Sequence, residues 1–232
     1  MTISYPEFHS DPRSAPHALP ATLRPVPARR PGVYRNLFKR AFDIAAVALA
    51  LPVVAPLILG LALAVRRDGG PAFYTHLRVG KDGRHFRMWK LRSMVANADA
   101  RMAAYLDANP AAQREWDKTQ KLKHDPRITG FGAFLRRSSL DELPQLWNVL
   151  TGDMSLVGPR PMMLNQQALY PGQAYFALRP GITGHWQTAG RNATAFEARA
   201  DYDTAYEADL SLNTDLRILA RTVGVVMRGT GY

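Results

Sequence analysis

A stretch of 22 residues, 44–65, contains no charged side chain and runs IAAVALALPVVAPLILGLALAV. As one continuous helix it would be ~33 Å long, which is close to the thickness of the hydrocarbon core of a bilayer. A helix inside a small soluble domain usually keeps a polar face, and this stretch has none. The sequence therefore predicts a membrane-embedded helix rather than a buried core helix.

Two features bear on how this helix enters the membrane. Pro52 and Pro56 lie in its middle, and a proline inside a helix removes a backbone hydrogen bond and favours a kink. A through-going span collects Lys and Arg on its cytoplasmic side, yet basic residues flank this stretch at both ends. A re-entrant helix that breaks near Pro56 and returns to the same face explains both features, while a kinked span stays open. The flanking basic residues are Arg35, Lys39, Arg40, Arg66 and Arg67.

The charge of the whole chain favours a polyanionic partner. Its 232 residues include 30 Lys+Arg and 19 Asp+Glu, which gives a formal net charge of +11. Nucleic acid, an anionic membrane surface and a phosphorylated substrate would all suit such a chain. Because cysteine is absent, disulfides, cysteine-ligated zinc, iron–sulfur clusters and a thiol nucleophile are excluded.

The remaining residues divide into a tail and one domain. The first 31 residues hold seven of the 17 prolines and show no apolar period, so we interpret residues 1–35 as a Pro-rich flexible tail. Residues 36–67 are then the membrane helix, and residues 68–232 form a small α+β domain that is mostly helical. Within it the sequence predicts a β-hairpin over 72–92 with its turn at 80–83, helices over 93–123 (broken near Pro110), 139–150 and 194–228, and mostly loop over 151–192.

The adjacent carboxylates of Asp141 and Glu142 are the main candidates for chemistry. Proline is tolerated in the first turn of a helix, so Pro144 predicts a helix that starts at about residues 140–142. Both carboxylates would then lie at a helix N-terminus, where the helix dipole favours negative charge. One of them could act as a nucleophile while the other holds a divalent cation. Ser139 and Glu142 also have the spacing of a capping box, and this structural alternative stays open on local sequence alone.

Cationic residues elsewhere could bind phosphate. Arg160 stands between Pro159 and Pro161, whose fixed φ angles would hold its guanidinium in place, although a rigid surface turn is an equal alternative. A glycine-rich segment over 179–192 could bring the backbone close to a ligand, with Arg191 directly after it, or could be a simple connector. The basic residues of the predicted hairpin could line a phosphate site, meet anionic lipid or be solvated: Arg78, Lys81, Arg87, Lys90 and Arg92.

Taken in order, these segments resemble the bacterial sugar transferases, which are monotopic polyprenyl-phosphate phosphoglycosyl transferases. The resemblance covers about residues 36–232. It begins with FKRAFD at 38–43 and the proline-containing apolar stretch. It continues through RVG at 78–80, WKLRSM at 89–94, DPRIT at 125–129, Arg136, SLDELPQLWNVL at 139–150, GDMSLVGPRP at 152–161, RPGITG at 179–184 and GRN at 190–192.

The resemblance implies an enzyme that transfers a sugar-1-phosphate from a UDP-sugar to undecaprenyl (polyprenyl) phosphate. UMP would leave, and the lipid-linked product would start the synthesis of an exopolysaccharide or another glycan. The family mechanism is ping-pong, which implies that Asp141 forms a covalent aspartyl-phosphosugar and that Glu142 and Mg²⁺ belong to the same centre, with both carboxylates as metal ligands. The phosphate-binding residues that the resemblance implies are Lys90, Arg136, Arg160 and Arg191.

The resemblance also implies a re-entrant membrane helix whose break is often a Ser-Pro pair. Here the pair is Ala55-Pro56, so Pro56 is present without the serine hydroxyl that could support the bend, and Pro52 is a second break residue. The implied location is the inner (cell) membrane of a bacterium, with a monotopic anchor and the catalytic domain on the cytoplasmic face. The expected partners are the two substrates and membrane lipids. A second copy of the chain and downstream glycosyltransferases are further candidate partners.

Other interpretations remain to be weighed against this one. A non-catalytic, membrane-anchored scaffold of polysaccharide assembly would keep its partners without Asp141 chemistry, and a lipid-phosphate phosphodiesterase would need no lipid acceptor. Binding to nucleic acid is suggested only by the charge and is not expected, because no recognisable binding module is present and the apolar stretch argues against it. The motifs leave the sugar open, and glucose-1-phosphate and galactose-1-phosphate are the first to test.

Overall fold

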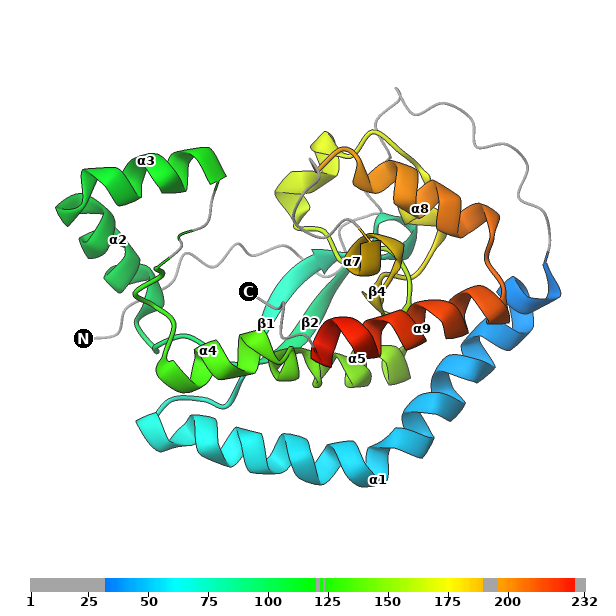
Figure 1. Ribbon diagram of the computed structural model, residues 1–232, viewed down its shortest axis with the longest axis horizontal. Helices are drawn as coiled ribbons and strands as arrows, with labels where there is room; N and C mark the ends of the chain where they lie inside the picture. Colours follow the sequence, from blue (N-terminus) through cyan, green and yellow to red (C-terminus); the bar gives the residue numbers. More distant parts are fainter. Residues whose placement is uncertain (1–31, 120–121, 123, 190–195, 228–232) are drawn as a thin grey trace.

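The computed structural model describes residues 32–119, 122, 124–189 and 196–227, which form a mostly helical fold with two small sheets (Figure 1). Most of the predicted tail therefore lies outside the described residues. The long helix α1 (Lys39–Val65) is followed by the hairpin of β1 (Phe73–Val79) and β2 (His85–Leu91). The remaining elements are α2 (Ala98–Ala108), α3 (Pro110–Thr119), α4 (Gly130–Arg137), α5 (Gln145–Thr151), β3 (Ser155–Val157), α6 (Ala174–Ala177), β4 (Gly181–Thr183), α7 (His185–Ala189), α8 (Arg199–Ala208) and α9 (Leu212–Met227). Short helical turns are η1 (Tyr34–Phe38), η2 (Arg66–Asp68), η3 (Lys81–Gly83), η4 (Leu140–Glu142) and η5 (Leu164–Leu169).

Helix α1 contains the apolar stretch and is long and apolar enough to cross a membrane. Most of its residues are exposed or partly exposed, as Leu49 and Val53 illustrate with 84% and 73% of their surface accessible, and its buried residues lie toward its two ends. The prediction that it is not a buried core helix is therefore confirmed, and its exposed apolar surface indicates membrane association. Pro52 and Pro56 lie inside the helix, and Figure 1 shows α1 bent rather than straight.

Both ends of α1 are attached to the domain. Near its start, Arg40 donates hydrogen bonds to the carbonyl oxygens of Val149 and Leu150 near the end of α5 (2.8 Å to the latter). At its far end, Arg92 donates to the carbonyl oxygen of Val65 (3.3 Å) and forms an ion pair with Asp68. The basic residues before the stretch thus contact protein, whereas Arg66 and Arg67 after it are exposed.

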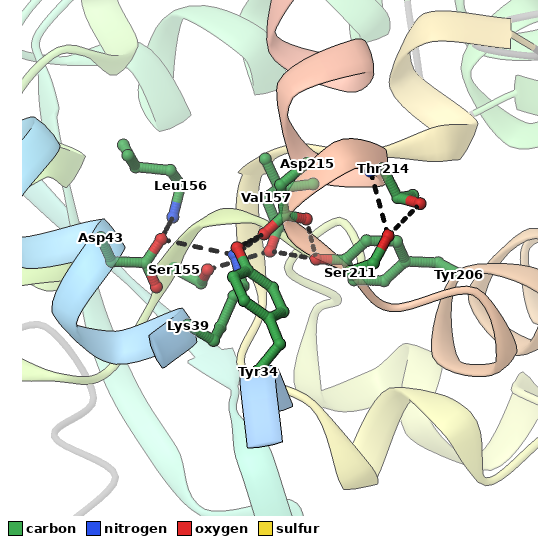
Figure 2. Close-up of polar contacts among 10 residues, drawn as sticks. All are labelled: Tyr34, Lys39, Asp43, Ser155, Leu156, Val157, Tyr206, Ser211, Thr214 and Asp215. Carbon is green, nitrogen blue, oxygen red and sulfur yellow. Dashed lines mark hydrogen bonds and ion pairs between the residues drawn. The ribbon is translucent and has the colours of Figure 1, made fainter. Parts of the chain in front are cut away.

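A buried polar network joins the start of α1 to α9 and β3 (Figure 2). The carboxylate of Asp215 accepts hydrogen bonds from the hydroxyls of Tyr34 and Tyr206, both at 2.6 Å, and pairs with the ammonium of Lys39 at 2.9 Å. Asp43, one turn further along α1, accepts the backbone N–H of Leu156 at 3.1 Å. Because these groups satisfy one another away from water, the loss of any one would leave a buried charge or donor unpaired.

The hairpin forms as predicted. β1 and β2 are antiparallel, with Tyr74 opposite Lys90 and Arg78 opposite Phe86. Asp82 and Gly83 in the turn both adopt positive φ angles, +56° and +75°, which an Asp-Gly pair accommodates. The predicted break near Pro110 is also present, since α2 ends at Ala108 and α3 begins at Pro110.

The segment over 151–192 was predicted to be mostly loop, but it contains a parallel pair formed by β3 and β4, together with η5, α6 and α7. The glycines are the reason that the strands come so close. A Cβ at Gly158 would lie 2.3 Å from the carbonyl oxygen of Arg179, and one at Gly181 would lie 2.1 Å from the nitrogen of Gly158. These glycines therefore allow backbone to approach backbone, rather than a ligand.

The predicted C-terminal helical region is present as α8 and α9. Ile218 of α9 is buried, whereas Leu212, Leu216 and Val223 are exposed, so the apolar stripe of this helix is only partly covered by the domain. Phe134 of α4 and Trp147 of α5 are also exposed. Helices α5 and α9 both contact α1, through Arg40 and Lys39 respectively, so apolar side chains lie exposed on the elements that surround the membrane-associating helix.

Candidate active site

Asp141 and Glu142 lie in the 3₁₀ turn η4, between α4 and α5. The predicted helix start at about residues 140–142 is confirmed, because the 3₁₀ turn η4 begins at Leu140; the α-helical part, α5, begins only at Gln145 with Pro144 as its N-cap. The capping-box alternative is wrong, since the Ser139 side chain makes no capping hydrogen bond. Instead Ser139 adopts a left-handed conformation with φ +57°, which is uncommon for a residue other than glycine and marks a constrained turn before the two carboxylates.

Lys90 joins the two carboxylates. Its ammonium nitrogen lies 2.7 Å from Oε1 of Glu142 and 3.5 Å from Oδ2 of Asp141. Asp141 is buried, with 7% of its surface accessible. Burial raises the pKa of the Asp141 carboxyl, and the neighbouring Glu142 raises it further, while the charges of Lys90 and Arg136 lower it. The pKa of Lys90 is raised, because attraction to the two carboxylates outweighs its burial.

Arg136 is held at the same centre from α4. Its Nε donates a hydrogen bond to the hydroxyl of Ser93 at 2.9 Å, and Ser93 follows β2. Helix α4 can approach this segment because residue 132 is glycine: a Cβ there would lie 1.9 Å from the Ser93 carbonyl oxygen. Thr129 caps α4 by accepting the N–H of Gly132 at 2.8 Å. The close contact between α4 and the end of β2 thus positions the Arg136 side chain beside the site.

Arg160 approaches from the end of β3. Its Nη2 lies 3.9 Å from Oε1 of Glu142. The backbone on either side of Pro159 is pinned to β4, because Gly158 donates to the Thr183 carbonyl at 2.9 Å and Gly181 donates to the Pro159 carbonyl at 2.8 Å. The structure thus brings Lys90, Arg136 and Arg160 to the predicted carboxylates, whereas Arg191 lies outside the described residues.

Asn148 is a supporting residue that the sequence analysis missed. It is buried on α5, where its Oδ1 accepts the N–H of Trp89 at 3.0 Å and its Nδ2 donates to the carbonyl of Arg87 at 2.8 Å. The amide therefore pairs with the free edge of β2 as another strand would. It fixes α5, and with it η4, against the strand that carries Lys90. The only signal in the sequence was a polar amide within the otherwise apolar run LWNVL at 146–150.

The carboxylate pair fits a magnesium ion only in part. Mg²⁺ is usually held by one or two carboxylates together with substrate phosphate and water, and Asp141 and Glu142 offer that minimal oxygen set. Among the described residues there is no group of three or more His, Cys, Asp or Glu side chains that could hold a metal. The pair therefore suits a cation that arrives with a phosphate substrate, and does not suit a site built from protein ligands alone.

Comparison with known proteins places this arrangement in a family. The family model described as bacterial sugar transferase matches residues 34–229. The chain is 46% identical over 198 residues to the undecaprenyl-phosphate galactose phosphotransferase of Salmonella typhimurium, covering 84% of this chain and 42% of that protein. It is 44% identical over 199 residues to the exopolysaccharide production protein ExoY of Rhizobium meliloti, covering 84% of this chain and 88% of that protein.

A further relative is the UDP-glucose:undecaprenyl-phosphate glucose-1-phosphate transferase of Escherichia coli, 38% identical over 203 residues, which cover 83% of this chain and 40% of that protein. The chain thus spans less than half the length of several curated relatives, but most of the length of ExoY. Since the family match begins before α1 and extends past the end of α9, and includes the carboxylate turn and its three cations, the chain belongs to the bacterial sugar transferase family.

Proposed function

We propose that this protein transfers a sugar-1-phosphate from a UDP-sugar to undecaprenyl phosphate, releases UMP and thereby starts the synthesis of an exopolysaccharide or related lipid-linked glycan. The observation that carries the proposal is the buried carboxylate of Asp141, which lies 3.5 Å from Lys90 and beside Glu142. A carboxylate is a weak nucleophile, and a phosphoryl group resists attack by anions until cations neutralise its oxygens. Lys90, Arg136 and Arg160 supply those cations around one carboxylate pair.

In the first half-reaction an oxygen of Asp141 attacks the β-phosphorus of the UDP-sugar. A new bond forms between this oxygen and phosphorus, and the bond from phosphorus to the bridging oxygen breaks. UMP leaves with that oxygen and its electron pair, while the sugar phosphate stays on Asp141 as an acyl phosphate. Lys90 lies within reach of both carboxylates. Its ammonium can therefore stabilise the charge of Asp141 before the attack and the charge on the phosphoryl oxygens as the attack proceeds.

In the second half-reaction a phosphate oxygen of undecaprenyl phosphate attacks the same phosphorus. The bond from phosphorus to Asp141 breaks, the free carboxylate returns, and a lipid-linked diphosphosugar is formed. The two steps are chemically alike, because a phosphate monoester is the leaving group in the first and the attacking group in the second. One set of cations can therefore serve both, which suits a single carboxylate centre.

Magnesium is the cation that we propose for this centre, with Asp141 and Glu142 as its protein ligands. When bound, it would neutralise phosphoryl oxygens of the donor. Removal of divalent cations by a chelator should abolish turnover, and added Mg²⁺ should restore it.

The attachment of α1 at both ends supports a re-entrant rather than a spanning helix. The start of α1 is bonded to α5, α9 and β3, and its end is bonded to the residues around Arg92, all within one domain. A helix that crossed the bilayer would place one of these attachments on the far side of the membrane. A bend at Pro52 and Pro56 would return the chain to the face on which the carboxylates lie, where a lipid phosphate would be presented. For this face we propose the cytoplasmic one.

The names of the relatives guide the choice of donor. The Salmonella typhimurium relative is named for galactose and the Escherichia coli relative for glucose. We therefore propose UDP-galactose and UDP-glucose as the first donors to test. The test is UMP release by the detergent-purified full-length protein, supplied with Mg²⁺, a short-chain polyprenyl phosphate and a panel of UDP-sugars.

The expected result is UMP release with at least one donor and its loss in the variant Asp141→Asn. This variant is nearly isosteric and keeps the fold, but its amide is no nucleophile. Exposed Asp107→Asn on α2 is the matched control and should behave as the wild type. Release that persists in Asp141→Asn would mean that another group is the nucleophile. Silence with every donor, while a related enzyme is active in the same assay, would favour the scaffold interpretation.

A further inference from the structure

A second group of cations lies beside the carboxylate centre, around the ring of Trp186. The guanidinium carbon of Arg199, on α8, lies 4.1 Å from the centre of this ring, and that of Arg160 lies 6.0 Å from it. Trp186 is buried on α7. Two arginines from distant parts of the chain thus lie against the same aromatic ring, where cation–π attraction holds them despite their like charge.

Arg78 adds a third cation from the hairpin. Side chains of a strand alternate between its two faces, so Tyr74 and Arg78 lie on the same face of β1, and Lys90 opposite Tyr74 lies on that face too. Arg78 lies opposite Phe86, four residues before Lys90 on β2, so the two cations are about 13 Å apart along the hairpin. Arg78 interacts electrostatically with both Arg160 and Glu142. The cations therefore continue from Lys90 through Arg160 to Arg78 and Arg199.

Arg78 and Arg199 each hold a donor without a partner. The Nε of each is buried and makes no hydrogen bond within the part of the chain that the structure describes. An unpaired buried donor on a charged group is costly, and such groups recur where a ligand completes them. Burial, followed by the charge of Arg160, lowers the pKa of both arginines, that of Arg199 to about 10. A bound anion would relieve both the missing hydrogen bonds and the repulsion.

The nearby carboxyl group of Asp203 does not replace such an anion. It accepts a hydrogen bond from the Tyr170 hydroxyl at 2.9 Å, and burial raises its pKa to about 7. Near neutral pH it therefore carries only part of a negative charge. Glu142 is the acidic group whose charge acts on Arg78, and Lys90 already pairs with it. The positive charge around Trp186 thus exceeds what the surrounding carboxylates neutralise.

We propose that Arg78 and Arg199, beside Trp186, form a subsite that binds a phosphate monoester next to the phosphorus attacked by Asp141. The proposal rests on the proposed function, in which a nucleoside monophosphate leaves the centre and a lipid phosphate enters it. Both are phosphate monoesters with terminal oxygens that a guanidinium can bind in pairs. Arg160 lies between the carboxylates and this subsite, so it would contact the bridging region of the donor diphosphate.

Binding is tested directly on the full-length, detergent-purified protein, with UMP and with a short-chain polyprenyl phosphate titrated separately by calorimetry. The variants are Arg78→Gln and Arg199→Gln, with exposed Arg101→Gln on α2 as the matched control. Loss of one charged hydrogen bond to phosphate should weaken binding roughly 10-fold to 100-fold. The control should bind as the wild type does, and Arg78→Lys should recover part of the loss because it keeps the charge.

The two ligands distinguish the source of the phosphate. Weaker UMP binding alone assigns the subsite to the leaving nucleotide, weaker lipid-phosphate binding alone assigns it to the acceptor, and weakening of both assigns it to the two in turn. Unchanged binding of both ligands in Arg78→Gln and Arg199→Gln, with unfolding temperatures equal to that of the wild type, would overturn the proposal. Should one variant fail to fold, the other and Arg78→Lys carry the same test.

Failure of this proposal and failure of the proposed function give different results. If Asp141→Asn still releases UMP, the proposed function fails whatever Arg78 and Arg199 do. If Asp141→Asn is inactive while both arginine variants bind UMP and lipid phosphate normally, only the subsite is wrong. Asp141→Asn should itself retain UMP binding, because the subsite arginines do not depend on its charge.

Discussion

Burial and charge act in opposite directions on the carboxyl group of Asp141. Burial raises its pKa, as does Glu142, while Lys90 and Arg136 lower it. A nucleophilic carboxylate has to be ionised, so the two cations keep Asp141 reactive inside a site that excludes water. Lys90, whose ammonium lies 3.5 Å from Oδ2 of Asp141, lowers this pKa more than Arg136 does, and it can be replaced without altering the backbone of η4.

Replacement of this lysine gives a testable pH dependence. In Lys90→Met the Asp141 pKa should rise, because an attractive charge is lost and burial remains. Activity falls as the pH drops through that pKa, so the acidic limb of kcat/KM should move to higher pH, in addition to a general loss of rate. Lys90→Arg, which keeps the charge, should shift the limb less. A uniform loss of rate at every pH would contradict this role.

At the scale of residues, the sequence predicted the chemical groups better than their setting. Asp141, Glu142, Lys90, Arg136 and Arg160 meet as the family motifs implied. The left-handed conformation of Ser139 and the unpaired Nε atoms around Trp186 could not be predicted. They depend on contacts between β1, η4, α7 and α8, which are far apart in the chain.

Among the elements, the β3–β4 pair determines where Arg160 lies. These strands have three residues each, and their pairing requires backbone contact at Gly158, Gly181 and Gly184. A Cβ on Gly184 would lie 2.2 Å from the Gly158 carbonyl oxygen. Since Pro159 and Arg160 follow directly, any side chain added here would displace the guanidinium as well as the strand.

The variant Gly158→Ala should therefore destabilise the protein by about 3 kcal/mol or more, because backbone atoms cannot move aside as a flexible side chain can. Gly224→Ala on α9 is the matched control: a Cβ there meets nothing within 4 Å, and alanine favours a helix by up to about 1 kcal/mol. The unfolding temperatures of the two variants in detergent measure both effects on stability. If the two variants unfolded at the same temperature, the close packing of β3 on β4 would be refuted.

Elements with a local signal were predicted and those made by distant contacts were not. The hairpin around Asp82-Gly83 and the break at Pro110 follow from turn and proline chemistry, and both are present. Strands of three residues within 151–192 are too short to show an alternating apolar pattern, so the residues of β3 and β4 were interpreted as loop. The helix start at residues 140–142 followed from Pro144 as well, but the sequence did not predict that its first turn, η4, is a 3₁₀ turn ahead of α5.

For the whole molecule, the attachment of α1 decides how the catalytic domain meets the membrane. The network of Lys39, Asp43 and Asp215 is buried and complete, and Arg92 secures the opposite end of the helix. An anchor fixed at both ends would hold the carboxylate turn at a constant depth relative to lipid headgroups. This suits a reaction between a soluble nucleotide sugar and a phosphate whose tail stays in the bilayer.

The buried carboxyl group of Asp203 predicts how global stability changes with pH. Burial raises its pKa to about 7, above the value near 4 of an unfolded chain. In that interval the folded state holds one more proton, so the stability that this group contributes at low pH is lost as the pH rises from about 4 to about 7.

Asp203→Asn should remove this part of the pH dependence while still accepting the Tyr170 hydrogen bond. The variant should gain stability relative to the wild type at pH 8 and not at pH 4, by up to about 1.4 kcal/mol for each unit of pKa shift. Unfolding temperatures measured at both values provide the comparison. Parallel curves for the two proteins would show that Asp203 is ionised in the folded state well below pH 7.

The most direct test of the central proposal is intact-protein mass spectrometry after incubation with Mg²⁺ and an active UDP-sugar, in the absence of lipid acceptor. We predict a protein whose mass has increased by one sugar phosphate, located on the peptide that contains Asp141, lost on addition of polyprenyl phosphate and absent in Asp141→Asn. Two results would contradict Asp141 as the nucleophile. One is an adduct on another residue. The other is turnover without any adduct, under trapping conditions that capture the adduct in a related enzyme.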